Sequence, residues 1–145
     1  MKKNKMLSGL SYNSRDPELM EIYQKTRILN AQFNSFALPN DEKAIQILTK
    51  LLKKLGDNSF IENPFYVDYG QFISIGKQCF IGRNCSFIDN NYIEIGDQVL
   101  IGPGVQIFTS YHPIKTTERI NKDGSYTTMS KPVKIHSNSW IGGSS

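Results

Sequence analysis

The sequence predicts a mainly β protein, a parallel β-helix preceded by a short segment of two helices. Isoleucine followed by glycine recurs through the second half of the chain, and the spacing within each block is six residues. Before that region, two stretches show helical periodicity instead. Self-similarity at a six-residue period is the signature of a parallel β-helix. Three short strands make one triangular coil of such a fold, and stacked coils bury a continuous core.

The N-terminal helices are predicted from caps and apolar spacing. The first lies in DPELMEIYQKTRILNAQFN, with Asp16 as its N-cap and Pro17 at the first helical position. The second lies in PNDEKAIQILTKLLKKLG, with Asn40 as its cap and Gly56 as its C-terminal stop. Its buried face should comprise Ala44, Ile47, Leu48, Leu51, Leu52 and Leu55. Residues 1–60 are therefore expected to form a helical segment that packs against the next part of the chain.

The β-helix is expected to occupy residues 61–145. A small or apolar residue stands two positions before each repeated isoleucine, so each block reads as a short strand with two inward side chains and a turn. Glycine suits a turn that a bulkier residue would strain. Residues eighteen positions apart should then stack. The Ile-Gly pairs begin at Ile75, Ile81, Ile95, Ile101 and Ile141.

Two cysteines, Cys79 and Cys85, occupy the same inward slot on successive strands of one coil. Residues six apart lie on different faces of the triangle and do not stack. We therefore expect both thiols to be unbridged and buried as small apolar fillers, with no disulfide and no nucleophilic role.

A polar stretch interrupts the repeat between residues 108 and 131. Insertions between β-helix coils become loops that project from one face. The dipeptide Asp123-Gly124 predicts a turn at the tip of this loop. His112 lies at the root of the loop, beside the rigid scaffold, where functional residues concentrate. Position and periodicity alone leave a structural and a catalytic role for this histidine both open.

Composition indicates one domain of ordinary globular character. The 145 residues are 39% hydrophobic and 21% charged, with no apolar run long enough to span a membrane and no signal peptide. A cytoplasmic location is the expectation that follows. The net charge of +4 comes from scattered lysines, which form no basic stripe interleaved with aromatics. We expect no nucleic-acid partner, and the charge serves either a solvated surface or attraction of an anionic ligand.

Several stretches together resemble the maltose and galactoside O-acetyltransferases. MLSGLSYNSRDPELMEIYQKTR is similar to their helical leader, and NPFYVDYGQFISIGKQCFIGRNCSFID with IEIGDQVLIGPGVQIFTSYHPI to their first coils. KPVKIHSNSWIGG is similar to the coil that follows their projecting loop. The resemblance implies a left-handed β-helix, a homotrimer without metal, and acetyl transfer from acetyl-CoA to a hydroxyl of a sugar or similar acceptor. Thr109 to Pro113 match the family's T-x-x-H-P context, which makes His112 the general base.

The same resemblance supplies the other site residues. Gly142 and Gly143 match the start of the surface that binds CoA, and the acceptor pocket follows VDYG, CFIGRNC and FIDNN. The family usually has asparagine at Gly82 and often arginine at Tyr23. From the residues alone, Asn84 and Asp89 could instead cap turns of the β-helix. The acceptor-binding candidates are Asp68, Phe80, Asn84, Asp89 and Asn90.

The sequence stops at Ser145, where members of this family continue into further coils that hold much of CoA. We therefore expect weak or no activity from these 145 residues. A non-catalytic trimeric β-helix module, or an inactive fragment of such an enzyme, is the main alternative. A zinc-dependent β-helix hydratase is a further one, but it needs three histidine ligands and the sequence holds only His112 and His136.

Overall fold

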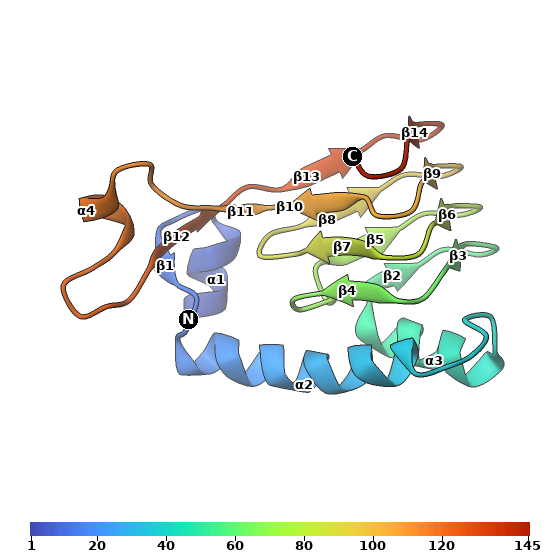
Figure 1. The fold of residues 1–145 in the computed structure, drawn as a ribbon, viewed down its shortest axis with the longest axis horizontal. Helices are drawn as coiled ribbons and strands as arrows, with labels where there is room; N and C mark the ends of the chain where they lie inside the picture. The colour runs from blue at the N-terminus through green and yellow to red at the C-terminus, as the bar shows by residue number, and fades with distance from the viewer.

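The computed structural model describes all 145 residues and shows a parallel β-helix closed at one end by helices (Figure 1). Eleven short strands build three faces, each a parallel sheet. The first face is β4 (Phe65–Val67), β7 (Cys85–Ile88) and β10 (Gln106–Phe108). The second is β2 (Lys54–Leu55), β5 (Ile73–Ile75), β8 (Ile93–Ile95) and β13 (Val133–Ile135). The third is β3 (Phe60–Ile61), β6 (Phe80–Ile81), β9 (Leu100–Ile101) and β14 (Trp140–Ile141).

Residues twenty positions apart stack, so the expected spacing of eighteen is wrong. Ile73 pairs with Ile93, and Phe60 pairs with Phe80. Two corners of each coil keep the six-residue step, but the corner that follows β4 and β7 is longer by two residues. The additional residues fall in the stretches 68–72 and 89–92, which contain three of the acceptor-binding candidates. The projecting loop leaves the β-helix at the same corner of the next coil, after β10.

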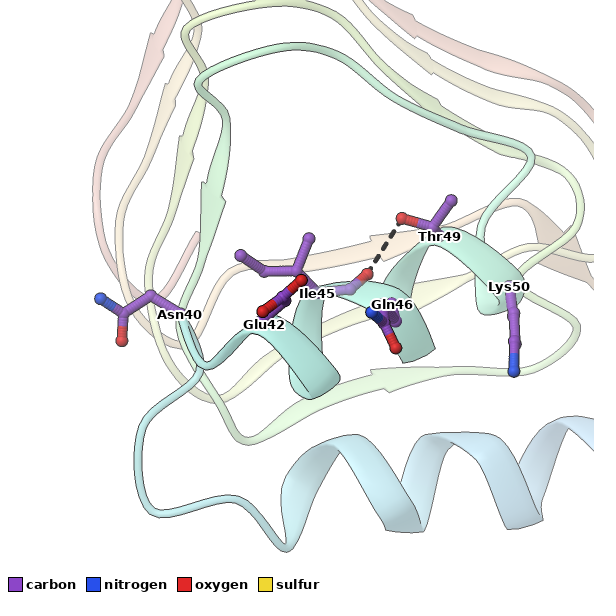
Figure 2. A pocket seen from close by; sticks show the side chains of 6 residues that line it. All are labelled: Asn40, Glu42, Ile45, Gln46, Thr49 and Lys50. Carbon is purple, nitrogen blue, oxygen red and sulfur yellow. Dashed lines mark hydrogen bonds between the residues drawn. The ribbon is translucent and has the colours of Figure 1, made fainter.

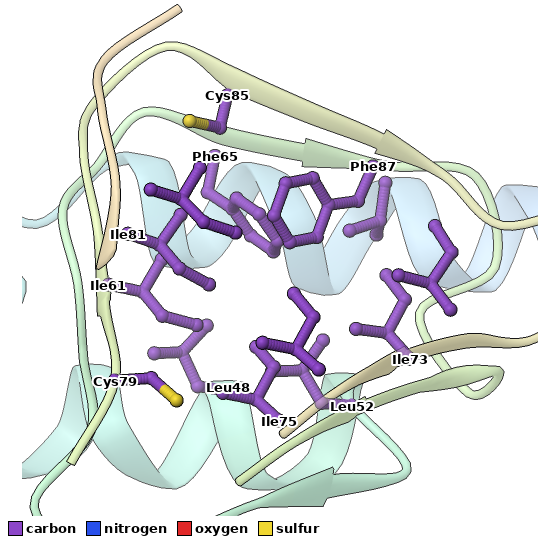
Figure 3. Close-up of a cluster of buried hydrophobic side chains, with 14 of the residues drawn as sticks. Leu48, Leu52, Ile61, Phe65, Ile73, Ile75, Cys79, Ile81, Cys85 and Phe87 are labelled. Atoms are coloured by element: carbon purple, nitrogen blue, oxygen red, sulfur yellow. The ribbon is translucent and has the colours of Figure 1, made fainter. Parts of the chain in front are cut away.

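The interior of the coils is filled by alternate side chains of each strand. Ile75, Ile81 and Ile101 are buried, as is Ile95, so the predicted inward register is confirmed. Cys79 and Cys85 are free and buried on different faces, also as predicted (Figure 3). The hydrophobic core formed in this way runs continuously through the stacked coils.

Close stacking between coils requires the glycine in four of the five Ile-Gly pairs, namely Gly76, Gly82, Gly96 and Gly102. A Cβ added at Gly76 would lie 2.4 Å from the carbonyl oxygen of Gly96 in the next coil. The left-handed backbone conformation does not occur at these glycines but at the corner residues Gln78 and Gln98, with a φ of 55° at both. The corner before each strand of the third face therefore turns on a polar residue, while the glycines of the Ile-Gly pairs allow neighbouring coils to approach closely.

The helical segment is shorter than predicted. α2 (Pro17–Asn34) begins as expected, with the Asp16 side chain accepting a hydrogen bond from Glu18 N at 3.1 Å. α3 (Glu42–Leu51) is capped by Asp41, one residue after the predicted Asn40, and its carboxylate accepts from Lys43 N at 2.9 Å.

The β-helix begins at β2, before the boundary expected at residue 60. Leu52 is already extended, and Leu55 pairs with Ile75 in the second face. Gly56 consequently forms a coil corner and does not stop the helix. Phe33 of α2 and Leu48 of α3 join the core beneath Ile61, so the helices close the open end of the first coil.

The projecting loop is tied to the N-terminus by a small antiparallel sheet. Its strands are β1 (Tyr12–Asn13), β12 (Thr127–Ser130) and β11 (Ser110–Tyr111), with β12 in the centre. Between β11 and β12 lie the single-turn α4 (Thr116–Arg119) and a turn at Gly124, whose φ is +81°. α1 (Lys2–Leu7) lies beside this sheet (Figure 1). None of the helices combines the length and apolar character needed to cross a membrane.

Candidate active site

His112 follows β11 and is exposed at the root of the projecting loop. Its Nδ1 lies 2.8 Å from the carbonyl oxygen of Thr127, the first residue of β12. A carbonyl oxygen can only accept, so Nδ1 carries the proton and Nε2 keeps a free lone pair. This is the tautomer that a general base requires at Nε2.

The root of the loop is fixed by buried hydrogen bonds. The Thr109 hydroxyl donates to Ile88 O at 2.7 Å and accepts from Asn91 N at 3.1 Å. The Asn91 side chain donates to Ser130 Oγ at 3.0 Å, and Ser130 Oγ donates to Met6 O at 2.7 Å. Both ends of the loop and the N-terminal segment are therefore anchored to the long corner of the β-helix.

Arg119 shapes the segment that follows His112. Its guanidinium donates to Ile114 O at 3.1 Å and to Pro113 O at 3.3 Å. Together with Ile120 and Tyr126, Arg119 and His112 line a hollow of about 250 Å³. The histidine thus faces an open space that is bounded by its own loop.

A second hollow, of about 220 Å³, lies at the long corner. Asp68 and Asn90 line it, and Arg15 and Tyr23 contribute from the N-terminal segment. Burial raises the pKa of Asp68, while hydrogen bonding from Asn90 and the positive charge of Arg27 act in the opposite direction. Two of the five predicted acceptor-binding residues therefore share one polar hollow.

Asp89 is completely buried and lies beneath the corner, outside the residues that line the hollow. Its Oδ1 accepts from Tyr69 N at 2.8 Å and from Asp68 N at 3.1 Å, and its Oδ2 accepts from Phe72 N at 3.3 Å. Burial raises the pKa of Asp89 to about 7, although these backbone hydrogen bonds lower it. The carboxyl group therefore holds the Asp68 backbone in place.

The pH dependence of stability should reveal this buried carboxyl group. The folded-state pKa of about 7 lies above the usual value near 4, so the folded chain binds the proton more tightly than the unfolded chain. The stabilisation that comes from this tighter proton binding by Asp89 is fully present below about pH 4. It is lost as pH rises towards 7, by up to roughly 1.4 kcal/mol of unfolding free energy per pH unit.

The matched variant is Asp89→Asn, which cannot titrate. We expect the free energy of unfolding of the wild-type chain, relative to this variant, to decrease between about pH 5 and pH 7 in denaturant titrations. A difference that stays constant over this range would show that the carboxyl group does not titrate there.

The remaining candidates lie away from both hollows within one chain. Phe80 points outward from β6, where its ring stacks on Phe60 with a centroid distance of 5.9 Å. Asn84 is an exposed corner residue with a φ of 62°. Gly142 and Gly143 are exposed after β14, at the last coil.

The largest hollow in the molecule contains none of these residues. It has a volume of about 520 Å³ and lies on α3, where Ile45, Thr49 and Lys50 contribute to its lining (Figure 2). All of its lining residues come from α3 and the residues just before it, and no histidine or cysteine is among them. Its chemistry gives no reason to place the reaction there.

Arg15 and Tyr126 were not identified from the sequence as site residues, and Tyr23 was noted only as a departure from the family. Arg15 and Tyr126 are exposed polar residues far apart in the chain, and no repeat places either of them. In the sequence, only the predicted N-cap at Asp16 bears on the position of Arg15, because it shows that the chain turns just before α2.

Comparison with known proteins identifies the family. Residues 5–56 match the maltose acetyltransferase hexapeptide capping motif, and residues 72–108 match the hexapeptide repeat of succinyl-transferase. A solved maltose O-acetyltransferase from Clostridium difficile 630 is 36% identical, with a TM-score of 0.91 over 99% of this chain and 75% of that one. The chain belongs to the maltose and galactoside O-acetyltransferase family. Its β-helix is accordingly the left-handed, hexapeptide-repeat type.

Two further relatives of the chain bear on function. A hexapeptide-repeat acetyltransferase from Vibrio cholerae, solved in complex with acetyl coenzyme A, is 30% identical, with a TM-score of 0.86 over 99% of this chain and 75% of that one. A putative acetyltransferase of Saccharomyces cerevisiae is 37% identical over 88% of this chain. The chain spans 63% of the length of the yeast relative.

Proposed function

We propose that this member of the family is an acetyl-CoA-dependent O-acetyltransferase that acts on a hydroxyl of a sugar or similar small acceptor, with His112 as the general base. The observation that carries the proposal is the hydrogen bond from His112 Nδ1 to Thr127 O. It leaves Nε2 free at a hollow within a fold shared with an acetyltransferase solved with acetyl coenzyme A.

The chemistry needs few groups. Nε2 of His112 takes the proton of the acceptor hydroxyl, and the hydroxyl oxygen forms an ester bond with the acetyl carbon as the carbon–sulfur bond of the thioester breaks. The protonated Nε2 returns this proton to the sulfur, and CoA leaves as the free thiol. Because the acceptor hydroxyl attacks the thioester directly, no covalent intermediate with the protein is required. Acetyl-CoA is a co-substrate in this scheme, and the remaining task of the protein is to position the two reactants.

The acceptor is proposed to bind at the hollow of the long corner. Asp68 and Asn90 offer oxygen and amide groups to sugar hydroxyls. Asp89 supports that corner from below, through the backbone of Asp68 and Tyr69. Gly142 and Gly143 are proposed to begin the surface that meets CoA.

Acetyl transfer is the direct test. The purified chain is incubated with acetyl-CoA and with maltose or methyl β-galactoside, and release of the CoA thiol is measured together with the acetylated sugar. However slow the reaction, acetyl transfer should release the two products in equal amounts. A chain that neither transfers acetyl groups nor binds acetyl-CoA in a calorimetric titration would instead be the non-catalytic module.

We also propose a homotrimer, the assembly that the family resemblance implies, and one face carries an exposed apolar row that would suit its contacts. Phe60, Phe80, Leu100 and Trp140 are aligned in register on the outside of the third face. Leu100 is 51% exposed and Trp140 is 80% exposed. Contiguous apolar surface of this kind marks protein–protein contacts. Assembly through this row would also bring Phe80 and the nearby Asn84 of one subunit towards the site of another.

Disruption of the row should separate the subunits. Leu100→Lys places a charge within the proposed contact, so we expect the mass measured by light scattering to fall from three times 16.5 kDa towards 16.5 kDa. Gln106→Lys is the control, because Gln106 is exposed on the first face. An unchanged mass in the Leu100 variant would place the contact elsewhere.

A further inference from the structure

Arg15 joins the two hollows of the candidate site. Its side chain lines the acceptor hollow together with Asp68, whereas Tyr126 lines the hollow of His112. The guanidinium carbon of Arg15 lies 5.2 Å from the centre of the Tyr126 ring. The two hollows therefore meet at this contact between the N-terminal segment and the projecting loop.

The pairing of β1 with β12 sets the positions of Arg15, Tyr126 and His112. Asn13 of β1 pairs with Thr127 of β12, so Arg15 follows and Tyr126 precedes the same pair. Thr127 also supplies the carbonyl oxygen that binds His112 Nδ1. The backbone of Arg15 is held in turn, because its N–H donates to Asn13 Oδ1 at 3.0 Å.

The guanidinium of Arg15 has unused hydrogen-bonding capacity. It makes no ion pair and donates no hydrogen bond within the chain, in contrast to Arg119. The cation–π contact with Tyr126 uses none of the N–H donors of the guanidinium, so all of them remain available. Asp68 presents acceptor oxygens in the same hollow, so donors and acceptors are both available to a molecule bound there.

We infer that Arg15 is a specificity-determining residue of the acceptor site, which binds oxygen atoms of the acceptor while Tyr126 holds the guanidinium in position. The ligand class is a polyhydroxylated molecule that gives oxygen lone pairs to Arg15 and hydroxyl protons to Asp68. This inference rests on the proposed function and adds to it the residue that selects the acceptor next to His112.

The first test is Arg15→Gln, with steady-state kinetics on methyl β-galactoside and maltose. A hydrogen bond from a charged donor is worth roughly 10- to 100-fold in binding, so the acceptor KM should rise by about that factor. We expect kcat to change less than about threefold and the KM for acetyl-CoA to stay constant. Lys122→Gln removes the same charge from the exposed tip of the loop and should leave all three constants unchanged.

The second test is a double-mutant cycle with Tyr126→Ala. Loss of the stacked ring should raise the acceptor KM about two- to fivefold in the wild-type background, the usual range for an exposed cation–π contact. It should have no further effect in the Arg15→Gln background, because Tyr126 acts through Arg15. Equal effects in both backgrounds would overturn the role assigned to the stack.

Failure of the inference can be told apart from failure of the proposed function. An active wild-type chain whose acceptor KM is the same in Arg15→Gln overturns the inference alone. If the wild-type chain transfers no acetyl group, binding of maltose is measured by NMR line broadening. Weaker binding by Arg15→Gln than by wild type supports the inference even then, and equal or absent binding overturns it.

Discussion

Replacing His112 with alanine should lower kcat for acetyl transfer by about a hundredfold to ten-thousandfold, the usual range for the loss of a general base. The hydrogen bond from Nδ1 to Thr127 O orients the ring, and Nε2 is the atom that takes the acceptor proton. Because the base acts on the acceptor hydroxyl, the affinity for acetyl-CoA, measured by calorimetry, should change little.

His136→Ala is the matched control for this experiment. His136 is the other histidine of the chain, is exposed after β13, and lines neither hollow. We expect its rate to equal that of the wild-type chain. If acetyl transfer survives in His112→Ala undiminished, the base has been assigned to the wrong residue, whereas a loss of acetyl-CoA binding in that variant would indicate damage to the fold.

The six-residue repeat was sufficient to predict the inward side chains. It placed Ile75 and Ile81 in the core and explained Cys79 and Cys85 without a disulfide. Periodicity works here because every inward slot must be small or apolar for the coils to stack. It gave the wrong coil length because the long corner carries polar residues, Asp89 among them, which lie outside the repeat.

The small sheet at the loop could not be predicted in the same way. β1 has two residues and β12 has four, and their partners, Tyr12 and Thr128, are separated by more than a hundred positions. Strands of this length carry no detectable alternation. Their pairing depends on where the β-helix places the loop, so the site around Arg15 and Tyr126 follows from tertiary structure.

The β-helix was also expected to begin later than it does. Leu55 fits the buried face of a helix and the inward slot of a strand equally well, and the sequence LLKKLG suggested the helix. Pairing of Leu55 with Ile75 decides in favour of the strand. The local helical preference is overridden at Leu55, because the core of the first coil needs its apolar side chain.

The largest loss of stability should come from Phe87→Ala, at about 3–5 kcal/mol in the free energy of unfolding. Phe87 is completely buried, and its ring meets that of Phe65 edge-on, with centroids 5.1 Å apart and an angle of 81° (Figure 3). Removal of the ring leaves a cavity between stacked coils. Those coils cannot close over it, because the backbone of Phe87 is paired in fixed register with Val67 in the strand on one side and Ile107 in the strand on the other.

Phe80→Ala provides the comparison, since Phe80 belongs to the same coil but points outward and is 38% exposed. Its ring stacks only on Phe60 within the chain, so denaturant titration of the chain as a monomer should show a cost of about 1 kcal/mol or less. Equal losses in the two variants would mean that the coil interior does not carry the stability of the fold. The expected difference follows from the alternation of the strand, which gives one phenylalanine to the core and leaves the other for contacts outside it.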